Sequence, residues 1–273
     1  LLLFGDGSDG STNIIDSSSN THAITVNGDA QISTTESKFG GSSLYFDGSG
    51  DCITASPSAD FDFGTNDFTI ECWINTSVIS INTYYRRVWA LGPDAANSIQ
   101  LLFFNGSSAS ANVSVRSNVQ LITGTINAAT GSWVHVAVCR AGTSLRLFVD
   151  GVQSGATAIN STNFNAGASN SLFVGRYPVG SAGHFNGYID DLRITKGVAR
   201  YTANFTPPIE SFSSPSTGFD SYFFYNSLLL RGNGTNGSTA ILDSSSNNHA
   251  ITVNGDAQIS TTQSKFGGSS IEF

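Results

Sequence analysis

The sequence contains a long internal duplication. Residues 1–46 return at 228–273, and 36 of the 46 aligned positions are identical. The differences between the copies are mostly conservative substitutions, such as Asp6 to Asn233 and Ile15 to Leu242. Both copies are therefore expected to fold alike and to present the same apolar faces. A repeat of domain length indicates a tandem array.

The second copy is expected to be only the opening piece of a domain. The first copy continues into Asp47–Ser56, whereas the second copy stops at Phe273. A β segment of this size buries too little apolar surface to offset the entropy lost on ordering, unless a partner covers its core face. Either copy can complete the elements that begin at Asp47. Docking on a second chain would link chains head to tail, as in domain swapping.

Composition disfavours two kinds of partner. Only 12% of the 273 residues are charged, the net charge is −8, and the isoelectric point is about 4.7. These values predict no binding to nucleic acid or anionic membranes. The longest apolar runs, such as Leu1–Phe4, are too short to insert into a membrane. The absence of methionine predicts a processed or partial chain.

The three cysteines are predicted to be buried free thiols. Cys52, Cys72 and Cys139 are an odd number, show no CxxC spacing, and each lies in an apolar run typical of a strand. Free thiols favour assembly in a reducing compartment over export through an oxidising one.

Short strands between Gly, Asn, Ser and Asp turns are predicted along most of the chain. In Phe68–Asn75 the pattern places Phe68, Ile70, Cys72 and Ile74 on one face. Asn27-Gly28 predicts a hairpin between 23–26 and 30–33. Some fourteen strands without a long helix favour an all-β fold, a two-sheet antiparallel jelly-roll sandwich.

The repeat and the prolines divide the chain into three predicted segments. We expect a jelly-roll domain over 1–212, a linker over 213–227, and the incomplete second copy over 228–273. Pro207, Pro208 and Pro215 interrupt strand continuity near the boundary. The linker carries an aromatic run that is unusual for a tether and is predicted to pack on a neighbouring domain or subunit: Phe219, Tyr222, Phe223, Phe224 and Tyr225.

Several segments resemble the laminin-G-like, concanavalin A-like jelly-roll family. They include FDGSGDCITAS (46–56), DFTIECWINT (67–76), GSWVHVAVCRAGTSLRLFVDG (131–151) and FNGYIDDLRITKGVARYTANFTPP (185–208). The resemblance implies two curved antiparallel sheets of six to seven strands, with the first and last strands paired. ITKGVARYTANFTPP is similar to segments of phage and marine bacterial surface proteins. The family includes sugar binders, spacers and, more distantly, glucanases, so the fold alone does not choose among them.

A hydrolase is not predicted. Glycoside hydrolysis needs two carboxylates flanking one bond, and the related glucanases place them on one strand face as alternating acids. Here Asp190 and Asp191 are adjacent and point to opposite faces, and Glu71 is alone in its strand.

The resemblance implies a structural calcium ion where the N-terminal loop meets the last strand. Its candidate ligands are Asp16, Asn20 and one of Asp190 and Asp191. The alternative is that Asp16 forms an Asx turn with the serines that follow it. Asp190 or Asp191 would then pair with Arg193.

Sugar binding needs exposed aromatic rings beside hydrogen-bonding groups. Tyr84 and Tyr85, and Tyr177 with His184, lie in loop-like stretches and are the candidates. The alternative is that these side chains cap the sandwich edges.

Two functions follow from these observations. The first is a non-enzymatic structural and adhesive module of a phage fibre, virion decoration or surface filament, assembled through repeats with copies of itself. The second is a carbohydrate-binding module that recognises cell-surface glycans. Both place the chain on a virion or at an extracellular surface.

Overall fold

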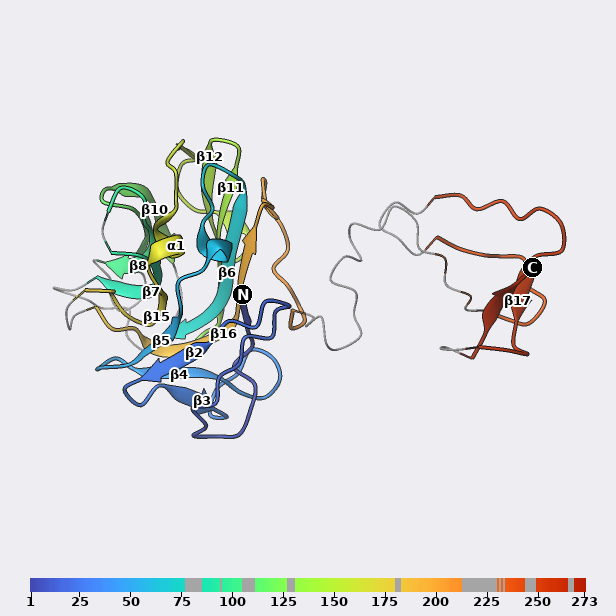
Figure 1. Ribbon diagram of the computed structural model, residues 1–273, viewed down its shortest axis with the longest axis horizontal. Coiled ribbons are helices and arrows are strands. Elements are labelled where there is room, and N and C mark those ends of the chain that lie inside the picture. Colours follow the sequence, from blue (N-terminus) through green and yellow to red (C-terminus); the bar gives the residue numbers. More distant parts are fainter. Residues whose placement is uncertain are drawn as a thin grey trace. The chain divides into compact units, whose positions relative to one another are not determined.

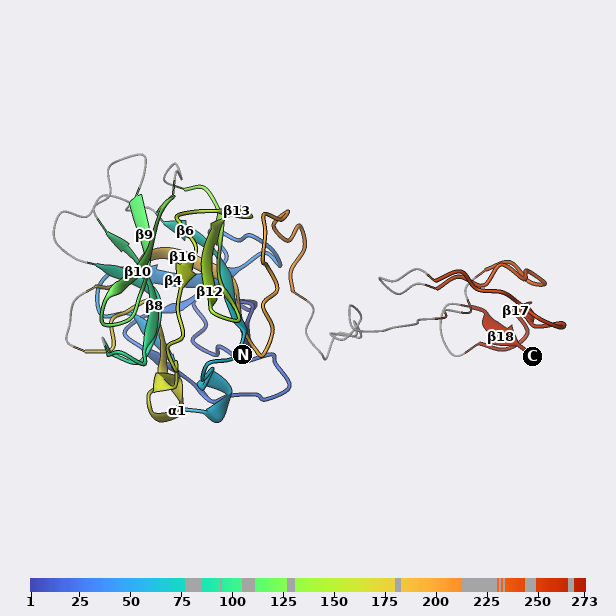
Figure 2. The same ribbon diagram turned by 90° about the horizontal axis from the view of Figure 1, so that it is seen from above.

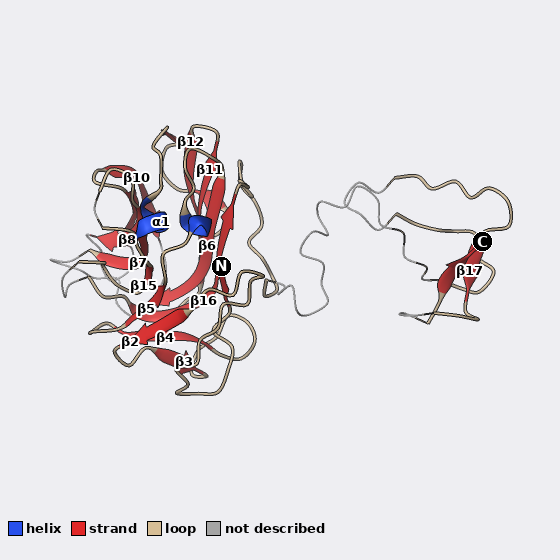
Figure 3. Cartoon of the chain, in the orientation of Figure 1, coloured by secondary structure: helices blue, strands red, loops and turns tan. Residues whose placement is uncertain are grey.

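The computed structural model describes residues 1–76, 85–93, 95–104, 111–126, 131–179, 183–212, 230, 232, 234–243, 249–264 and 268–273. The chain divides into two compact units, Leu1–Phe212 and Ser213–Phe273. Strands dominate the first unit, which also has two short helical turns among its described residues, whereas the described part of the second unit is mostly loop with one hairpin (Figure 3).

The first unit is a sandwich of two antiparallel sheets (Figures 1 and 2). This confirms the jelly-roll prediction, although one sheet is larger than the six to seven strands expected, because short strands add to it. The nine-stranded sheet has the order β13-β12-β11-β6-β16-β4-β3, with β1 paired to β16 and β14 paired to β12. Its members are β1 (Leu2–Leu3), β3 (Gln31–Ser33), β4 (Ser43–Asp47), β6 (Phe68–Thr76), β11 (Val134–Ala141), β12 (Ser144–Val149), β13 (Val152–Gln153), β14 (Ala158–Ile159) and β16 (Asn186–Lys196).

The second sheet has seven strands in the order β10-β9-β8-β7-β15-β5-β2. They are β2 (Ile24–Asn27), β5 (Cys52–Ala55), β7 (Arg86–Leu91), β8 (Ile99–Phe104), β9 (Ala111–Arg116), β10 (Gln120–Ile126) and β15 (Leu172–Val174). A 3₁₀ turn, Ala59–Phe61, lies beside the one-turn helix α1 (Ala166–Ser169) (Figure 2). The amide of Ser58 donates to the carbonyl of Gly167 over 3.1 Å and ties these two turns together.

Alternate residues of the strands fill the core between the sheets. Phe68, Ile70, Cys72 and Ile74 are all buried there, as the alternation in β6 predicts. The three cysteines are free and buried, which confirms that prediction. Burial raises the pKa of the Cys52 thiol to about 11.

The outer face of the nine-stranded sheet is covered as well. Residues 197–212, which we call the return segment, cross it after β16. Thr69 Oγ1 donates to the carbonyl of Val198 over 2.9 Å and accepts from the amide of Arg200 over 2.9 Å. The rings of Tyr201 and Phe205 pack on an outer cluster of Ala137, Cys139 and Phe148. This cover explains why Thr69 and Glu71, on the outer face of β6, are buried.

The predicted Asn27-Gly28 hairpin is wrong. β2 pairs with β5 in the seven-stranded sheet, whereas β3 pairs with β4 in the nine-stranded sheet. The two strands place apolar residues on the same core from opposite sides, so the turn carries the chain from one sheet to the other. Gly28 has φ +71, a conformation that suits glycine.

The second unit contains one described sheet, the hairpin of β17 (Gln258–Ser260) and β18 (Ser270–Glu272). These strands occupy the repeat positions of β3 and β4, and the register Ile259 to Ile271 matches Ile32 to Leu44. The two copies therefore form the same local hairpin, as the duplication predicts.

Candidate functional site

Two of the tyrosines predicted to bind sugar lie against one arginine. Tyr85 immediately precedes β7, and Tyr177 follows β15, its neighbour in the seven-stranded sheet. Cζ of Arg87 lies 4.2 Å from the ring centroid of Tyr177 and 5.6 Å from that of Tyr85. Both distances fall within cation–π range, so adjacent strands bring the two rings to one guanidinium.

A second arginine extends this arrangement. Cζ of Arg116, the last residue of β9, lies 5.5 Å from the ring centroid of Tyr85. The ring of Phe104 is 5.9 Å from the same ring. We call Tyr85, Arg87, Arg116 and Tyr177 the tyrosine–arginine cluster. Tyr85 remains 44% exposed, so the cluster opens to solvent at its ring.

Arg87 is held in place by its neighbours. Its Nη1 donates to the carbonyl of Tyr85 over 2.8 Å, and its Nε donates to Oε1 of Gln100 over 3.3 Å. The backbone amide of Arg87 donates to the carbonyl of Gly183 over 3.0 Å. Arg87 and Gln100 are both buried, so the geometry beneath the two rings is fixed. Arg87 was not among the predicted binding residues, although its position two residues after Tyr85 is a usable signal.

Of the other two predicted sugar-binding residues, the structure describes His184. His184 is buried, and its Nδ1 lies 3.4 Å from the carbonyl oxygen of Asp51, so the ring is packed inside the unit. Its own carbonyl accepts from Nη1 of Arg86 over 2.8 Å. Tyr84 lies outside the described residues.

The Asp16 carboxylate binds several backbone amides of the N-terminal loop. Its Oδ1 accepts from the amides of Leu2 and Ser18, and its Oδ2 accepts from the amide of His22 over 2.9 Å. Oδ2 also lies 2.6 Å from Nδ1 of His22. Burial alone would raise the pKa of Asp16, but the amides of Ser18 and Leu2 outweigh it and lower the pKa to about 2. Asn20 points instead to Asp60, donating from Nδ2 over 2.7 Å.

Asp190 and Asp191 anchor two different loops. β16 has a bulge between Asp190 and Arg193, and Asp191 has φ +48. Asp190 Oδ2 accepts from the amides of Lys38 and Phe39 over 2.9 and 3.1 Å. Asp191 accepts from the hydroxyl of Ser211 over 2.9 Å and from the amide of Phe212 over 2.7 Å. The bulge thus lets adjacent carboxylates hold the loop before β4 and the end of the return segment. Burial raises the pKa of Asp190 to about 7 and that of Asp191 to about 6.

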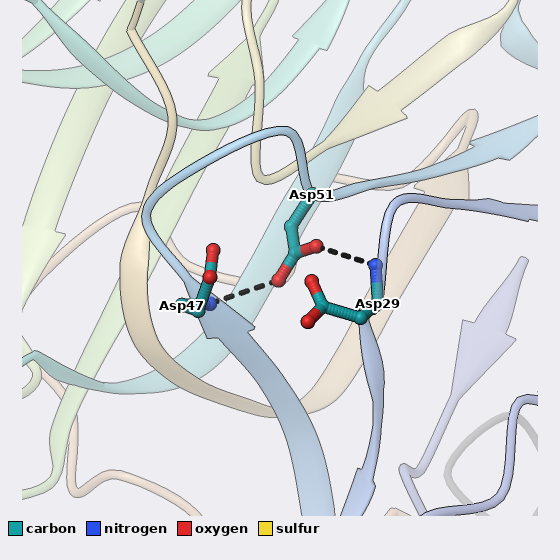
Figure 4. Close-up of side chains that lie close together, drawn as sticks. All are labelled: Asp29, Asp47 and Asp51. Carbon is teal, nitrogen blue, oxygen red and sulfur yellow. Dashed lines mark hydrogen bonds between the residues drawn. The ribbon is translucent and has the colours of Figure 1, made fainter.

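Within the described part of the chain, one group of three carboxylates is compact enough to hold a metal ion. Oxygens of Asp29, Asp47 and Asp51 all lie within 4.8 Å of one another (Figure 4). The buried Asp51 accepts from the amides of Asp29 and Asp47, each over 2.9 Å. It therefore holds two of the places where the chain passes from one sheet to the other, between β2 and β3 and between β4 and β5. These residues were not among the predicted ligands, although each stands next to a glycine in a turn-like stretch.

These carboxylates differ in how well they fit calcium. Calcium takes six to eight oxygen ligands in flexible geometry. Each oxygen of Asp16 already accepts at least two hydrogen bonds from the protein. Asp29 and Asp47 are less buried, and with Asp51 they form an all-oxygen set. Calcium binding stays a prediction.

Glu71 is enclosed in a network rather than presented to a substrate. It is fully buried beneath the return segment. Its Oε1 accepts from Nη2 of Arg193 over 2.7 Å, and its Oε2 accepts from the hydroxyl of Tyr201 over 2.8 Å. His135 Nε2 lies 3.3 Å from Oε2. Burial alone would raise the pKa of Glu71, but the neighbouring His135 and Arg193 side chains outweigh it and lower the pKa to about 2.

The predicted aromatic assembly residues Phe219, Tyr222, Phe223, Phe224 and Tyr225 lie outside the described residues. In the described ranges, none of the helices has the length and apolar character needed to span a bilayer.

Comparison with protein families identifies the class. The family model for the concanavalin A-like lectin/glucanases superfamily, Laminin_G_3, matches residues 47–200. The chain therefore belongs to this superfamily. The match covers most of the first unit and confirms the resemblance seen in the sequence. Among curated proteins, no match was found.

Solved structures with the same fold include binding domains. Domain 4 of AbnA, a GH43 extracellular arabinanase from Geobacillus stearothermophilus solved in complex with arabinotriose, has a TM-score of 0.51 and 19% identity, covering 72% of this chain and 92% of that chain. The receptor-binding domain of botulinum neurotoxin C/D mosaic serotype has a TM-score of 0.52 and 13% identity, covering 73% and 48%. The binding domain of Paraclostridial Mosquitocidal Protein 1 has a TM-score of 0.50 and 15% identity, covering 73% and 49%. The chain spans about half the length of these two toxin domains.

Proposed function

We propose that the chain is a non-enzymatic adhesive module that recognises carbohydrate through the tyrosine–arginine cluster. The observation that carries this proposal is the seating of Tyr85 and Tyr177 on the single guanidinium of Arg87. A tyrosine ring stacks on the apolar face of a sugar, and fixed polar groups beside it orient the hydroxyls. The solved AbnA domain of the same fold carries arabinotriose, which makes short arabino-oligosaccharides a reasonable first probe.

The carboxylates support binding without hydrolysis. Glu71 is buried in a network with Arg193, Tyr201 and His135. Asp190 and Asp191 hold backbone amides of separate loops. A glycosidase needs one carboxyl group that donates a proton to a bound sugar and another that faces it across the bond. None of these three acids is presented in that way.

A structural role in a repeated assembly is the second candidate. It is favoured by the hairpin of the second unit, which reproduces the β3–β4 register of the first. A module that recurs along a fibre, a virion surface or a cell-surface filament would present several glycan sites at once. Such multivalency raises avidity without any new contact.

A glycan array tests the main proposal. The intact chain is expected to bind a restricted set of glycans, and Tyr85→Ala and Tyr177→Ala are each expected to weaken binding about tenfold, or ~1.4 kcal/mol. The matched control is Tyr188→Ala, because Tyr188 packs on Tyr45 in the other sheet, with ring centroids 5.1 Å apart. No binder on the array, or equal losses in all three variants, would overturn the proposal.

A further inference from the structure

The side chain of His22 lies between two carboxylates in the first unit. Nδ1 of its ring is 2.6 Å from Oδ2 of Asp16, and Nε2 is 3.0 Å from Oδ2 of Asp60. Asp16 belongs to the N-terminal loop before β2, whereas Asp60 belongs to the 3₁₀ turn Ala59–Phe61, which follows β5. The imidazole therefore bridges two segments that are about forty residues apart in the chain.

The His22 ring has a fixed position. Its side chain is only 8% exposed, and the ring stacks on Phe61 with centroids 4.8 Å apart and an interplanar angle of 27°. The backbone amide of His22 also donates to Oδ2 of Asp16 over 2.9 Å. Because the backbone and the ring are anchored to the same carboxylate, Nε2 is directed at Asp60.

The partners of Asp16 decide which nitrogen of the ring carries the proton. Oδ1 accepts from the amides of Leu2 and Ser18, and Oδ2 accepts from the hydroxyl of Ser18 and the amide of His22. A carboxylate that accepts hydrogen bonds on both oxygens acts as an acceptor toward the ring as well, so Nδ1 of His22 is the donor. In the neutral imidazole, Nε2 then presents a lone pair.

This lone pair faces another acceptor. An ionised carboxylate has only lone pairs to offer, so Nε2 of His22 and Oδ2 of Asp60 repel each other unless a cation lies between them. Asn20 converges on the same carboxylate, because its side-chain amide lies 2.7 Å from Oδ2 of Asp60. Turning that amide over exchanges its nitrogen and its oxygen. The three side chains then offer an imidazole nitrogen, a carboxylate oxygen and an amide oxygen.

We propose that His22, Asp60 and Asn20 bind a divalent transition-metal ion such as zinc, with Asp16 orienting the imidazole. Metal-binding histidines almost always donate their other ring N–H to a carboxylate, a carbonyl or water, and Asp16 has that position here. Zinc holds nitrogen and oxygen ligands at about 2.0–2.2 Å, so ligand atoms 3.0 Å apart are adjacent ligands of one ion. This set differs from the calcium ligands that the resemblance implies, because Asp16 lies behind the imidazole.

The proposed site is accessible and joins two parts of the fold. The side chain of Asp60 is 43% exposed, and Asn20 is exposed as well, so an ion and its water ligands can reach both. A bound ion would tie the N-terminal loop to the 3₁₀ turn that lies beside α1. An ion that binds only this folded arrangement stabilises the first unit by mass action. None of the ligands belongs to the tyrosine–arginine cluster.

Titration of the full-length chain with Zn²⁺ tests the site. Metal is first removed with a chelator, and binding is followed by calorimetry at about pH 7.5, where an ordinary imidazole is mostly neutral. The three cysteines are buried and do not compete for the ion. We expect one saturable site, at least about tenfold weaker binding in Asp60→Asn, and Ca²⁺ binding at least about tenfold weaker than Zn²⁺ binding, because calcium prefers oxygen ligands.

A second variant and a matched control complete the experiment. His22→Gln is expected to abolish the site, and thermal unfolding in the absence of metal shows whether each variant is folded. The control is His249→Gln, because His249 pairs with Asp243 over 2.8 Å but its side chain is 54% exposed, and its affinity for Zn²⁺ is expected to equal that of the wild type.

Four results would overturn the proposal. They are the absence of a saturable site, equal Zn²⁺ affinity in the wild type and Asp60→Asn, an equal loss in His249→Gln, and Ca²⁺ binding as tight as Zn²⁺ binding. The first two would mean that a proton, rather than a metal ion, lies between His22 and Asp60. The readout requires no glycan, so it is independent of the test of the tyrosine–arginine cluster.

Discussion

At the scale of single residues, one buried acid organises the outer face of the nine-stranded sheet. Glu71 is ionised because Arg193, His135 and Tyr201 converge on its two oxygens. Through Tyr201 it also holds the return segment. An isolated carboxylate in this position would pay a large desolvation cost, which these partners offset.

Replacing Glu71 with Gln is expected to lower the free energy of unfolding at pH 7 by about 3–5 kcal/mol, because Arg193 then lacks its buried partner. The pKa of Glu71 is about 2 in the folded state, below its ordinary value of 4.5. The stabilisation is therefore complete above pH 4.5 and is lost as the pH falls from 4.5 to 2. Urea unfolding at several pH values measures this slope.

The exposed Glu210 provides the control for that experiment. Glu210→Gln is expected to leave both the stability at pH 7 and the acid slope unchanged. If Glu71→Gln and the wild type lost stability equally between pH 4.5 and 2, the assignment of the slope to Glu71 would be wrong.

At the scale of elements, the turns decide which strands meet. Asp150-Gly151 joins β12 to β13 as a two-residue hairpin, with Val149 opposite Val152 and φ values of +47 and +75. The carbonyl of Gly151 also accepts from the amide of Phe205 over 2.8 Å. The turn therefore shapes the hairpin and holds the return segment at once.

Gly151→Ala is expected to destabilise the first unit more than Gly142→Ala. Both glycines have positive φ, so each substitution costs about 1–2 kcal/mol in backbone strain. A Cβ at Gly151 would also collide with the carbonyl oxygen of Phe205, adding about 1–3 kcal/mol, whereas a Cβ at Gly142 meets nothing within 4 Å. Thermal unfolding of the two variants gives the difference, and equal destabilisation would contradict this role of the turn.

The sequence predicted the elements better than their connections. Alternation in β6 and the apolar runs around the cysteines identified the core strands, because side-chain period and burial are local properties. The Asn27-Gly28 turn has the local sequence pattern of a hairpin, but it joins strands of different sheets. The path of the chain after the turn depends on the hydrogen bond from the amide of Asp29 to Asp51, which is distant in sequence. The pairing of Tyr85 with Tyr177 was likewise invisible, because it arises from the adjacency of β7 and β15. The buried networks of Asp191 and Glu71 required the return segment to be placed, and that of Asp190 required the loop before β4.

At the scale of the whole molecule, the chain combines one complete sandwich with a repeated opening layer. The first unit has its own core and belongs to the concanavalin A-like lectin/glucanases superfamily. The second unit reproduces a local hairpin without a second sheet to cover it among the described residues. An isolated hairpin is at best marginally stable in water, so the two units are expected to differ in stability.

Amide hydrogen exchange at low protein concentration measures that difference within one molecule. The amides of Ile32 and Ile259 have the same neighbours in sequence and donate to equivalent carbonyls, Ser11 and Ser238, each over 2.8 Å. Ile259 is expected to exchange at least about a hundredfold faster, because only local opening is needed to expose it. Equal protection would mean that the second unit is stabilised by contacts not accounted for here.

We propose that this sandwich binds sugar where two strands bring Tyr85 and Tyr177 to Arg87. Calorimetric titration of the strongest array ligand into the wild type and Tyr177→Ala tests it most directly, with thermal unfolding of the variant as a check on folding. We expect saturable binding by the wild type and about tenfold weaker binding by a folded Tyr177→Ala. Unchanged affinity in the folded variant would contradict the claim.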